Sequence, residues 1–383
     1  MSEQANYGCA AGFGTRLIGC VDDMVLPIVM HDFTEAARRC VLVDKTMFIA
    51  DVLDCDASVV VCCRPEGFGK SMNLSMLRAF LGRPAVGRAG RSMFAGSRIW
   101  DADGGRYRGE YACYPVVSLD FSGAAGSGAA VAGVVRDALS SECVRLLPFL
   151  EAPGLPRDKV RHIERVARGA ANEDEVDSVV AVLIELLEMA CDEQVVLLVD
   201  GYDAAWLSCA GIRGTRDDGS AELLDRVLFD AIVAAGDSMR LACLMGERPG
   251  PAEAALALRG CSYCSATPLS TWCDRWFGFS DAEVEALLSH AGREEYLDDA
   301  REWLEGYRFG GAYCSSPARV IGFLDRGCTP PVRADLYGYA DCLSRAVCDW
   351  NLDRLSVLFD LLEAHGCVEV SLCLGAAGTD EVH

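Results

Sequence analysis

The chain has 383 residues, a formal net charge of −22 and a hydrophobic content of 51%. This length is enough for two domains with buried cores, and the acidic balance disfavours non-specific binding to nucleic acid or anionic lipid. There is no run of about 18 apolar residues and no charged-then-apolar leader, so we expect a cytoplasmic protein without a transmembrane helix.

The sequence pattern divides the chain into three parts. Residues 1–22 show no apolar periodicity, and we expect them to form a partly disordered lead. Residues 23–270 alternate between β-like runs and helix-like spacing, whereas residues 271–383 are mainly helical in pattern. Early in the second part, residues 41–43 predict a short strand and residues 46–53 predict a helix with one apolar face.

The most informative stretch is residues 59–71, which read VVVCCRPEGFGKS. The apolar start predicts a buried strand, the glycines predict a tight loop, and the spacing over residues 72–81 predicts a helix. The first turn of a helix carries unpaired N–H groups and partial positive charge, which suit a phosphate group. In such a loop Gly69 permits close approach of the anion, Lys70 reaches the β- and γ-phosphates, and the Ser71 hydroxyl binds Mg²⁺.

One position departs from the complete phosphate-loop pattern. The pattern begins with glycine, where this chain has Arg64. The alternative interpretation is therefore an ordinary Gly-rich turn, with Lys70 solvated in the first helical turn and Ser71 acting as a cap.

A second informative stretch lies far downstream. Residues 195–199 are all apolar and predict a short buried strand that ends at Asp200. Ligands bind at the carboxyl ends of strands in open parallel sheets, and in P-loop enzymes an aspartate at this place holds Mg²⁺. The alternative for Asp200 is a solvated residue at a strand end. Asp203 belongs either to the site or to a structural hydrogen-bond arrangement.

The remaining pattern predicts an α/β protein with a doubly wound parallel sheet, covered on both faces and followed by a helical C-terminal domain. Strands are expected at residues 114–121 and 240–245. Helices are expected at residues 129–147, 174–190, 222–234, 282–290, 301–304, 317–323, 337–350 and 352–364.

Several of these stretches together resemble the AAA-ATPase-like family, predicted bacterial P-loop ATPases of the additional-strand class that often carry a nuclease-like domain. The resemblance extends over roughly residues 26–325. It is carried by motifs in a fixed order: Leu26-Pro27-Ile28, Val43-Asp44-Lys45-Thr46, Arg64-Pro65 with Phe68-Gly69-Lys70-Ser71, Tyr114-Pro115-Val116, Asp200 with Tyr202-Asp203, Phe277-Gly278-Phe279 and Gly306-Tyr307-Arg308-Phe309-Gly310. The family itself carries Arg-Pro at the start of the loop, and we find no nuclease-like site in the tail.

The resemblance implies an ATP-binding protein that uses Mg²⁺. We also expect a protein partner, which the sequence does not identify. Asp200 and Asp203 are the implied catalytic residues, and Ser71 and Asp200 are the implied metal ligands. The implied nucleotide-binding residues are the loop and the first helical turn: Arg64, Pro65, Glu66, Gly67, Phe68, Gly69, Lys70, Ser71 and Met72.

Two departures from the family bear on activity. Glu66 and Gly67 stand where the family has basic residues, and an acid here should weaken attraction for phosphate. Gly201 stands where the family has the glutamate expected to orient or activate the attacking water. We therefore expect ATP binding with weak or lost hydrolysis, partly restored by Gly201→Glu, with Glu247 as a candidate substitute base. The alternative is a nucleotide-independent interaction module derived from a P-loop ATPase.

Overall fold

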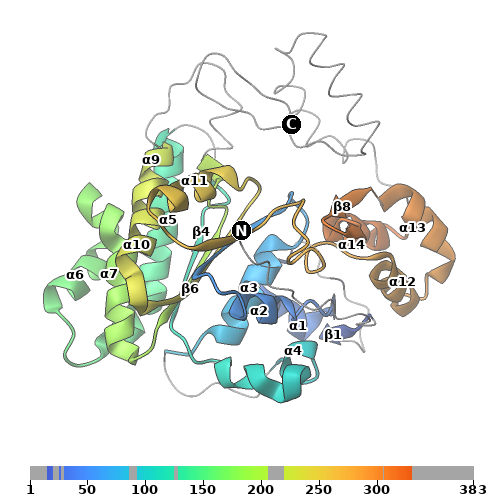
Figure 1. Cartoon of the computed structure of the whole chain (residues 1–383), viewed down its shortest axis with the longest axis horizontal. Helices are drawn as coiled ribbons and strands as arrows, with labels where there is room; N and C mark the ends of the chain where they lie inside the picture. The colour runs from blue at the N-terminus through green and yellow to red at the C-terminus, as the bar shows by residue number, and fades with distance from the viewer. Residues whose placement is uncertain are drawn as a thin grey trace, which may run out of the picture.

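The computed structural model describes residues 15–19, 26, 30–85, 93–124, 128–205, 220–304 and 306–329. Most of the expected N-terminal lead and both helices expected at 337–350 and 352–364 lie outside these residues. The fold is a mixed α/β arrangement around a central sheet (Figure 1).

The central sheet has five strands in the order β4-β5-β6-β3-β7, and every neighbouring pair is parallel. The strands are β3 (Val59–Cys63), β4 (Val116–Asp120), β5 (Val195–Asp200), β6 (Met239–Gly246) and β7 (Tyr263–Ala266). The sequence predicted four of these strands, β3, β4, β5 and β6, and the structure confirms them. It did not predict β7.

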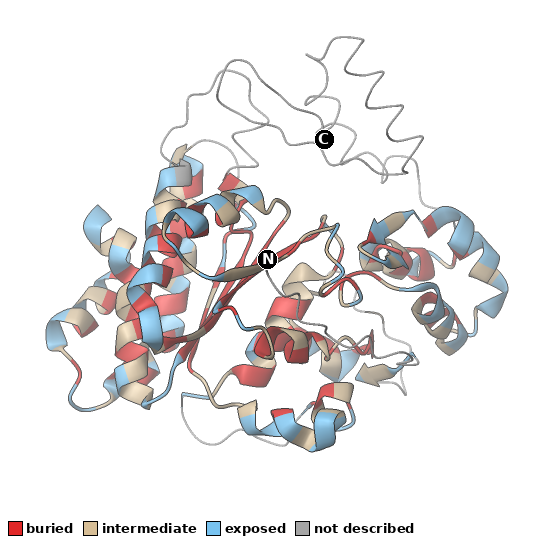
Figure 2. Cartoon of the chain, in the orientation of Figure 1, coloured by how far each residue is buried: buried red, intermediate tan, exposed pale blue. Residues whose placement is uncertain are grey.

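Both faces of this sheet are buried, as Figure 2 shows by its red strands. Alternate residues of each strand point to opposite faces, so β3 sends Val59 and Val61 to one core and Val60 and Cys62 to the other. The continuous apolar runs of β3 and β5 follow from this two-sided burial, because neither face has to meet water.

The first face is covered by the elements nearest the N-terminus and by the helix that follows β3. They are α1 (Phe33–Arg39), α2 (Phe48–Leu53), α3 (Lys70–Leu81), α4 (Arg98–Asp101) and the 3-10 segment η1 (Ala102–Glu110). A short antiparallel pair, β1 (Leu17–Gly19) with β2 (Val41–Val43), lies beside α1.

The second face is covered by long helices that come from the connections after β4, β5 and β6 (Figure 1). They are α5 (Gly128–Leu146), η2 (Leu147–Glu151), α6 (Arg157–Ala167), α7 (Glu173–Cys191), α9 (Ser220–Leu224), the π-helical η3 (Asp225–Asp230), α10 (Ala231–Ala235), η4 (Gly236–Ser238) and α11 (Gly250–Leu258).

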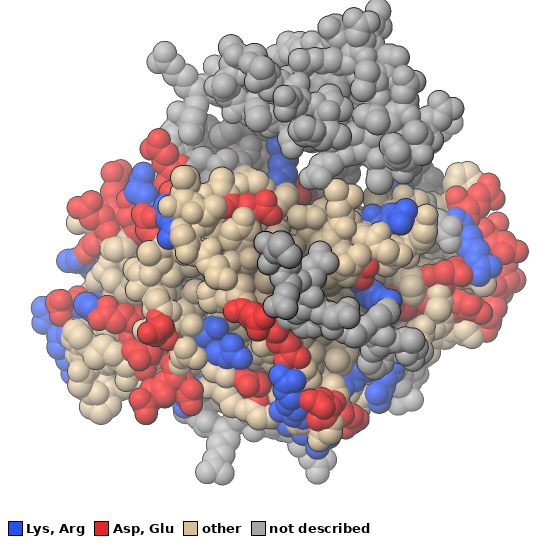
Figure 3. All heavy atoms as spheres, viewed as in Figure 1, with Lys and Arg blue, Asp and Glu red and all other residues tan. Residues whose placement is uncertain are grey.

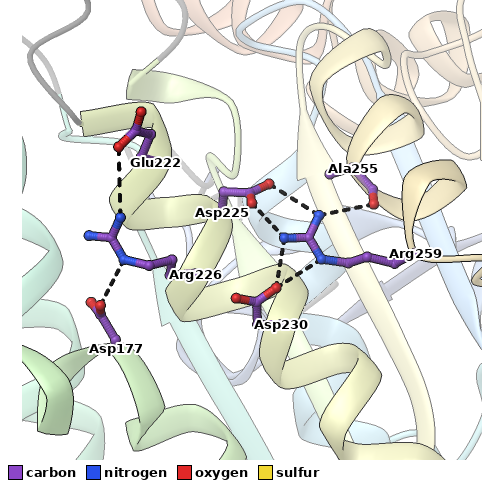
Figure 4. Close-up of polar contacts among 7 residues, drawn as sticks. All are labelled: Asp177, Glu222, Asp225, Arg226, Asp230, Ala255 and Arg259. Carbon is purple, nitrogen blue, oxygen red and sulfur yellow. Dashed lines mark hydrogen bonds and ion pairs between the residues drawn. The ribbon is translucent and has the colours of Figure 1, made fainter.

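Two arginines tie these helices together in Figure 4. Arg259 donates to both Asp225, at 2.5 Å, and Asp230, at 2.7 Å, and so joins the end of α11 to η3. Arg226 on η3 pairs with Asp177 of α7 at 2.7 Å. Because Arg259 has two acidic partners and is only 19% exposed, its ion pairs fix the packing of α11 more firmly than an isolated surface pair would.

The C-terminal described helices α12, α13 and α14 form a smaller core together with Val43 of β2. The bounds of the C-terminal elements are α12 (Asp281–His290), η5 (Glu294–Tyr296), α13 (Leu297–Leu304), β8 (Tyr307–Phe309), β9 (Ala312–Cys314) and α14 (Pro317–Asp325). Ser280 and Glu283 form a capping box at the start of α12. The stretch at 306–310, expected within a helical region, instead leads into an antiparallel hairpin.

Candidate functional site

The site is built where β3 passes into α3 through the loop 64–69. Gly67 and Gly69 both have φ of +80°, a left-handed conformation that glycine adopts without the strain imposed on other residues. Gly69 is the N-cap of α3 and offers no side-chain cap to the first-turn amides. A Cβ built on Gly69 would meet nothing within 4 Å, so the described residues leave open space beside this glycine at the start of α3.

Lys70 lies across this loop. Its Nζ donates to the carbonyls of Arg64, at 2.8 Å, and Pro65, at 2.9 Å, and its side chain is 13% exposed. Glu247, at the end of β6, places Oε1 3.8 Å from the same Nζ. The ammonium group therefore lies beside the loop with two carbonyl partners and the acidic Glu247 close to it.

Ser71 and Asp200, the two residues predicted to hold a metal ion, are brought together. Ser71 lies near enough to the Asp200 carboxylate to lower its pKa, although β3 and β5 are separated in the sheet by β6. Burial raises the pKa of Asp200, and the neighbouring Asp120 adds to that rise, whereas Ser71 and Lys70 lower it. A hydroxyl and a buried carboxylate are oxygen ligands of the kind Mg²⁺ takes, so these two residues fit the ion.

Asp120 is an acidic neighbour that we did not single out from the sequence. It ends β4 directly beside Asp200 in the register of the sheet, and its carboxylate accepts from the Ser122 amide and hydroxyl. The signal was available, since Asp120 lies one residue before the end of the strand predicted at 114–121. Across the described residues, no group of three or more His, Cys, Asp or Glu side chains is arranged to hold a metal by itself.

The structure places the Arg64 side chain away from the open mouth of the loop. Its guanidinium is fully buried and donates to the carbonyls of Cys63, at 2.8 Å, and Ala266, at 2.7 Å. Burial lowers its pKa. Its Nε has no hydrogen-bond partner. Arg64 thus links the start of the loop to β7, and its charge is directed into the protein.

The other loop residues divide between exposure and burial. Glu66 is exposed at the tip, whereas Phe68 is 1% exposed. Pro65 contributes its carbonyl to Lys70, and Met72 packs against the sheet with the rest of α3. A role for each in nucleotide binding stays a prediction.

The buried Asp203 carboxylate accepts hydrogen bonds from two backbone amides. Its Oδ2 accepts from the amides of Glu247, at 2.8 Å, and Arg248, at 2.7 Å, and it is 1% exposed. Burial raises its pKa, and these two amides oppose the rise. Of the two roles left open by the sequence, this geometry matches the structural one, because Asp203 fixes the turn that carries Glu247.

Gly201 differs from what the sequence led us to expect. Its φ is +66°, and a Cβ built there would lie 2.5 Å from both the N and Cα atoms of Ser122. Its amide donates to the Met245 carbonyl at 2.9 Å. A glutamate at 201 would therefore collide with the backbone after β4, so the expectation that Gly201→Glu restores activity is not supported by this conformation.

These features define a P-loop-type α/β arrangement, with a parallel strand, a Gly-rich loop, a helix N-terminus and an aspartate two strands away in one sheet. The chain belongs to the predicted AAA-ATPase family, whose pattern it matches over residues 27–248. No curated protein and no solved structure matches it. The motifs at 277–279 and 306–310 lie beyond the matched residues.

Proposed function

We propose that this protein binds ATP with Mg²⁺ at the loop 64–71 and hydrolyses it slowly or not at all. Membership of the predicted AAA-ATPase family supports nucleotide use. The strand order supports the additional-strand class of P-loop proteins. In this order β6 lies between β3, which leads through the loop to Lys70, and β5, which ends at Asp200.

One observation supports this function most strongly. Lys70 and Ser71, in the first turn of α3, both lie near enough to Asp200 to lower its pKa, and a Cβ at the preceding Gly69 would meet nothing within 4 Å. A helix N-terminus, an ammonium group and two metal-binding oxygens are the groups that hold a triphosphate and its cation. The Mg²⁺ ion, when bound, would neutralise phosphate charge, while Ser71 and Asp200 would hold it and Lys70 would orient the phosphates.

Slow turnover follows from the absence of a glutamate after Asp200. General-base assistance is typically worth about 10²–10⁴-fold in rate. Gly201 cannot supply it, and Asp203 is engaged by two backbone amides. The direct test is to measure ATP binding and ATP turnover on the same purified protein. Binding with turnover near that of ordinary P-loop ATPases would show that another residue acts as the base.

Glu247→Gln tests whether Glu247 is that base. The Glu247 carboxylate lies 3.8 Å from Lys70 Nζ, where it competes with phosphate for the ammonium group. Loss of its charge should therefore tighten ATP binding by about 2–5-fold, the scale of a partly exposed ion pair. Turnover should fall at the same time if Glu247 activates water. Glu253→Gln on α11 is a matched control, because Glu253 also lies just after β6. Tighter binding with unchanged turnover would assign Glu247 to charge balance only.

Glu66→Arg tests the acid at the tip of the loop. The substitution removes a like charge near the phosphates and adds a cation, so ATP affinity should rise by about 2–5-fold at low salt. Glu66 is exposed, which allows the change without repacking. Equal or weaker affinity, measured by titration at two salt concentrations, would show that position 66 faces away from the phosphates.

The alternative function is a nucleotide-independent interaction module. It would require that the same loop bind no ATP even at millimolar concentration. The exposed Glu66 and the glycine at 201 favour it, whereas the Lys70, Ser71 and Asp200 constellation favours nucleotide binding.

The wider setting of the protein also remains a proposal. We infer three parts, 1–22, 23–270 and 271–383, a cytoplasmic location and a protein partner. Every cysteine among the described residues is a free thiol, which suits a reducing compartment. None of the described helices is long and apolar enough to cross a membrane. On the face in Figure 3, acidic side chains gather toward both ends with basic ones scattered among them, which supports a role other than non-specific nucleic-acid binding.

A further inference from the structure

The phosphate loop is held from the C-terminal side by aromatic packing. The Phe68 ring meets Tyr307 edge-on at 4.7 Å and Phe309 at 4.9 Å, both from β8. These rings and Cys314 of β9 form a small buried cluster of their own. A large apolar side chain at the tip of an otherwise Gly-rich loop is thus buried by residues more than 200 positions downstream.

The backbone of the same loop is bound by the start of α14. The Gly67 carbonyl accepts from the Ser316 hydroxyl at 3.1 Å and from the Ala318 amide at 3.2 Å. A Cβ added at Gly67 would lie 3.1 Å from the Ala318 Cβ, so the two backbones approach closely. This contact fixes the loop residue that precedes Phe68.

The beginning of the loop is held in a related way. The Arg64 guanidinium carbon lies 4.7 Å from the Phe309 ring centre and 5.0 Å from that of Phe277. Phe309 therefore contacts both Arg64 and Phe68, at the two sides of the loop. We name residues 307–318, which comprise β8, β9 and the start of α14, the C-terminal clamp.

We propose that the C-terminal clamp positions the phosphate loop, so that docking of the clamp and binding of nucleotide stabilise each other. The coupling to nucleotide, but not the positioning of the loop, rests on the proposed ATP function. A loop with two left-handed glycines has much conformational freedom to lose, and contacts with three of its residues reduce that loss before the anion arrives. Coupling between two sites is reciprocal, so nucleotide must hold the clamp closed as strongly as the clamp favours nucleotide.

Hydrogen exchange of the Ala318 amide measures this coupling, because that amide donates to the loop itself. If ATP binds only the docked state, ATP·Mg²⁺ at ten times its Kd should slow exchange of Ala318 by about tenfold. The amides of α6, far from the loop in the fold, supply the reference (Figure 1). A purely structural clamp would show no dependence on nucleotide.

The variant Phe309→Leu tests the clamp without nucleotide. Loss of its aromatic contacts should speed exchange of Ala318, and of the Asn73 amide that donates to Gly69 at the loop end, by about 3–10-fold. The matched control is Phe229→Leu, since Phe229 is equally buried and also has an arginine, Arg259, near its ring. The control should leave Asn73 unchanged.

The outcomes separate the clamp from the ATP function. Slower Ala318 exchange with ATP, together with faster Asn73 exchange in Phe309→Leu, supports the whole proposal. Protection of Asn73 by ATP without protection of Ala318 overturns the coupling while ATP binding stands. If the protein does not bind ATP, the proposed function fails. The exchange rates measured without nucleotide then test the clamp by themselves. Equal exchange of the Asn73 amide in Phe309→Leu and Phe229→Leu would overturn the clamp.

Discussion

Replacing Lys70 by alanine should weaken ATP binding by about 10–150-fold, because a charge-assisted contact of an ammonium with phosphate contributes roughly 1.5–3 kcal/mol. Lys70 Nζ already sits at the mouth of the loop, held by two carbonyls of that loop. Its removal leaves the glycines and the helix N-terminus in place, so the loss measures the ammonium group rather than the fold.

The control for this prediction is Lys159→Ala. Lys159 is a lysine on α6 paired with Glu185, on the opposite face of the sheet from α3. It should leave ATP affinity unchanged while removing the same charge from the protein. Equal affinity in wild type and Lys70→Ala, measured by calorimetric titration, would mean that the loop does not hold the triphosphate.

A side chain at Gly201 should destabilise the fold rather than restore catalysis. Gly201→Ala combines a left-handed backbone with a Cβ 2.5 Å from the Ser122 backbone, and we expect a loss of roughly 2–6 kcal/mol in the free energy of unfolding. Gly201→Glu should be at least as damaging. The ATP turnover of Gly201→Glu should therefore be compared with wild type only after the folded fraction of the variant has been measured.

Gly169→Ala is the matched control for Gly201. Gly169 has nearly the same φ, +67°, but a Cβ there would meet nothing within 4 Å. This control should lose only the strain of the left-handed conformation, about 1–2 kcal/mol. Similar urea midpoints for the two alanine variants would contradict the steric account, and a stable, faster Gly201→Glu would revive the idea of a missing base.

The sequence was most informative where local pattern and burial coincide. The apolar runs of β3 and β5 have both faces covered, so their hydrophobicity alone indicated buried strands. The glycines and Lys70 then located the helix N-terminus, and Asp200 marked the carboxyl edge of the sheet. From these three signals the sequence predicted that Lys70, Ser71 and Asp200 lie near one another.

Features that depend on distant contacts were harder to predict. β7 is a short edge strand whose first three residues are only partly buried, so its sequence lacks the apolar run of a central strand. The hairpin of β8 and β9 was assigned to a helical region. Its Tyr307 and Phe309 pack against Phe68, a contact that no local spacing reveals.

At two positions of the site, the sequence could not predict where a side chain points or whether there is room for one. Arg64 lies in the loop motif, yet its guanidinium enters the protein because the Cys63 and Ala266 carbonyls bind it there. Gly201 was read as a missing glutamate, whereas the backbone of Ser122 occupies the place of any side chain. Both depend on neighbouring strands that are far away in the chain.

The most direct test of the central claim is a calorimetric titration of the wild-type protein with ATP, with and without Mg²⁺. Oxygen atoms of Ser71 and Asp200 stand beside the loop. We therefore expect one saturable site per chain that binds more tightly when Mg²⁺ is present. An absence of heat and of saturation up to millimolar ATP, in protein shown to be folded, would contradict the claim and leave the interaction module as the better account.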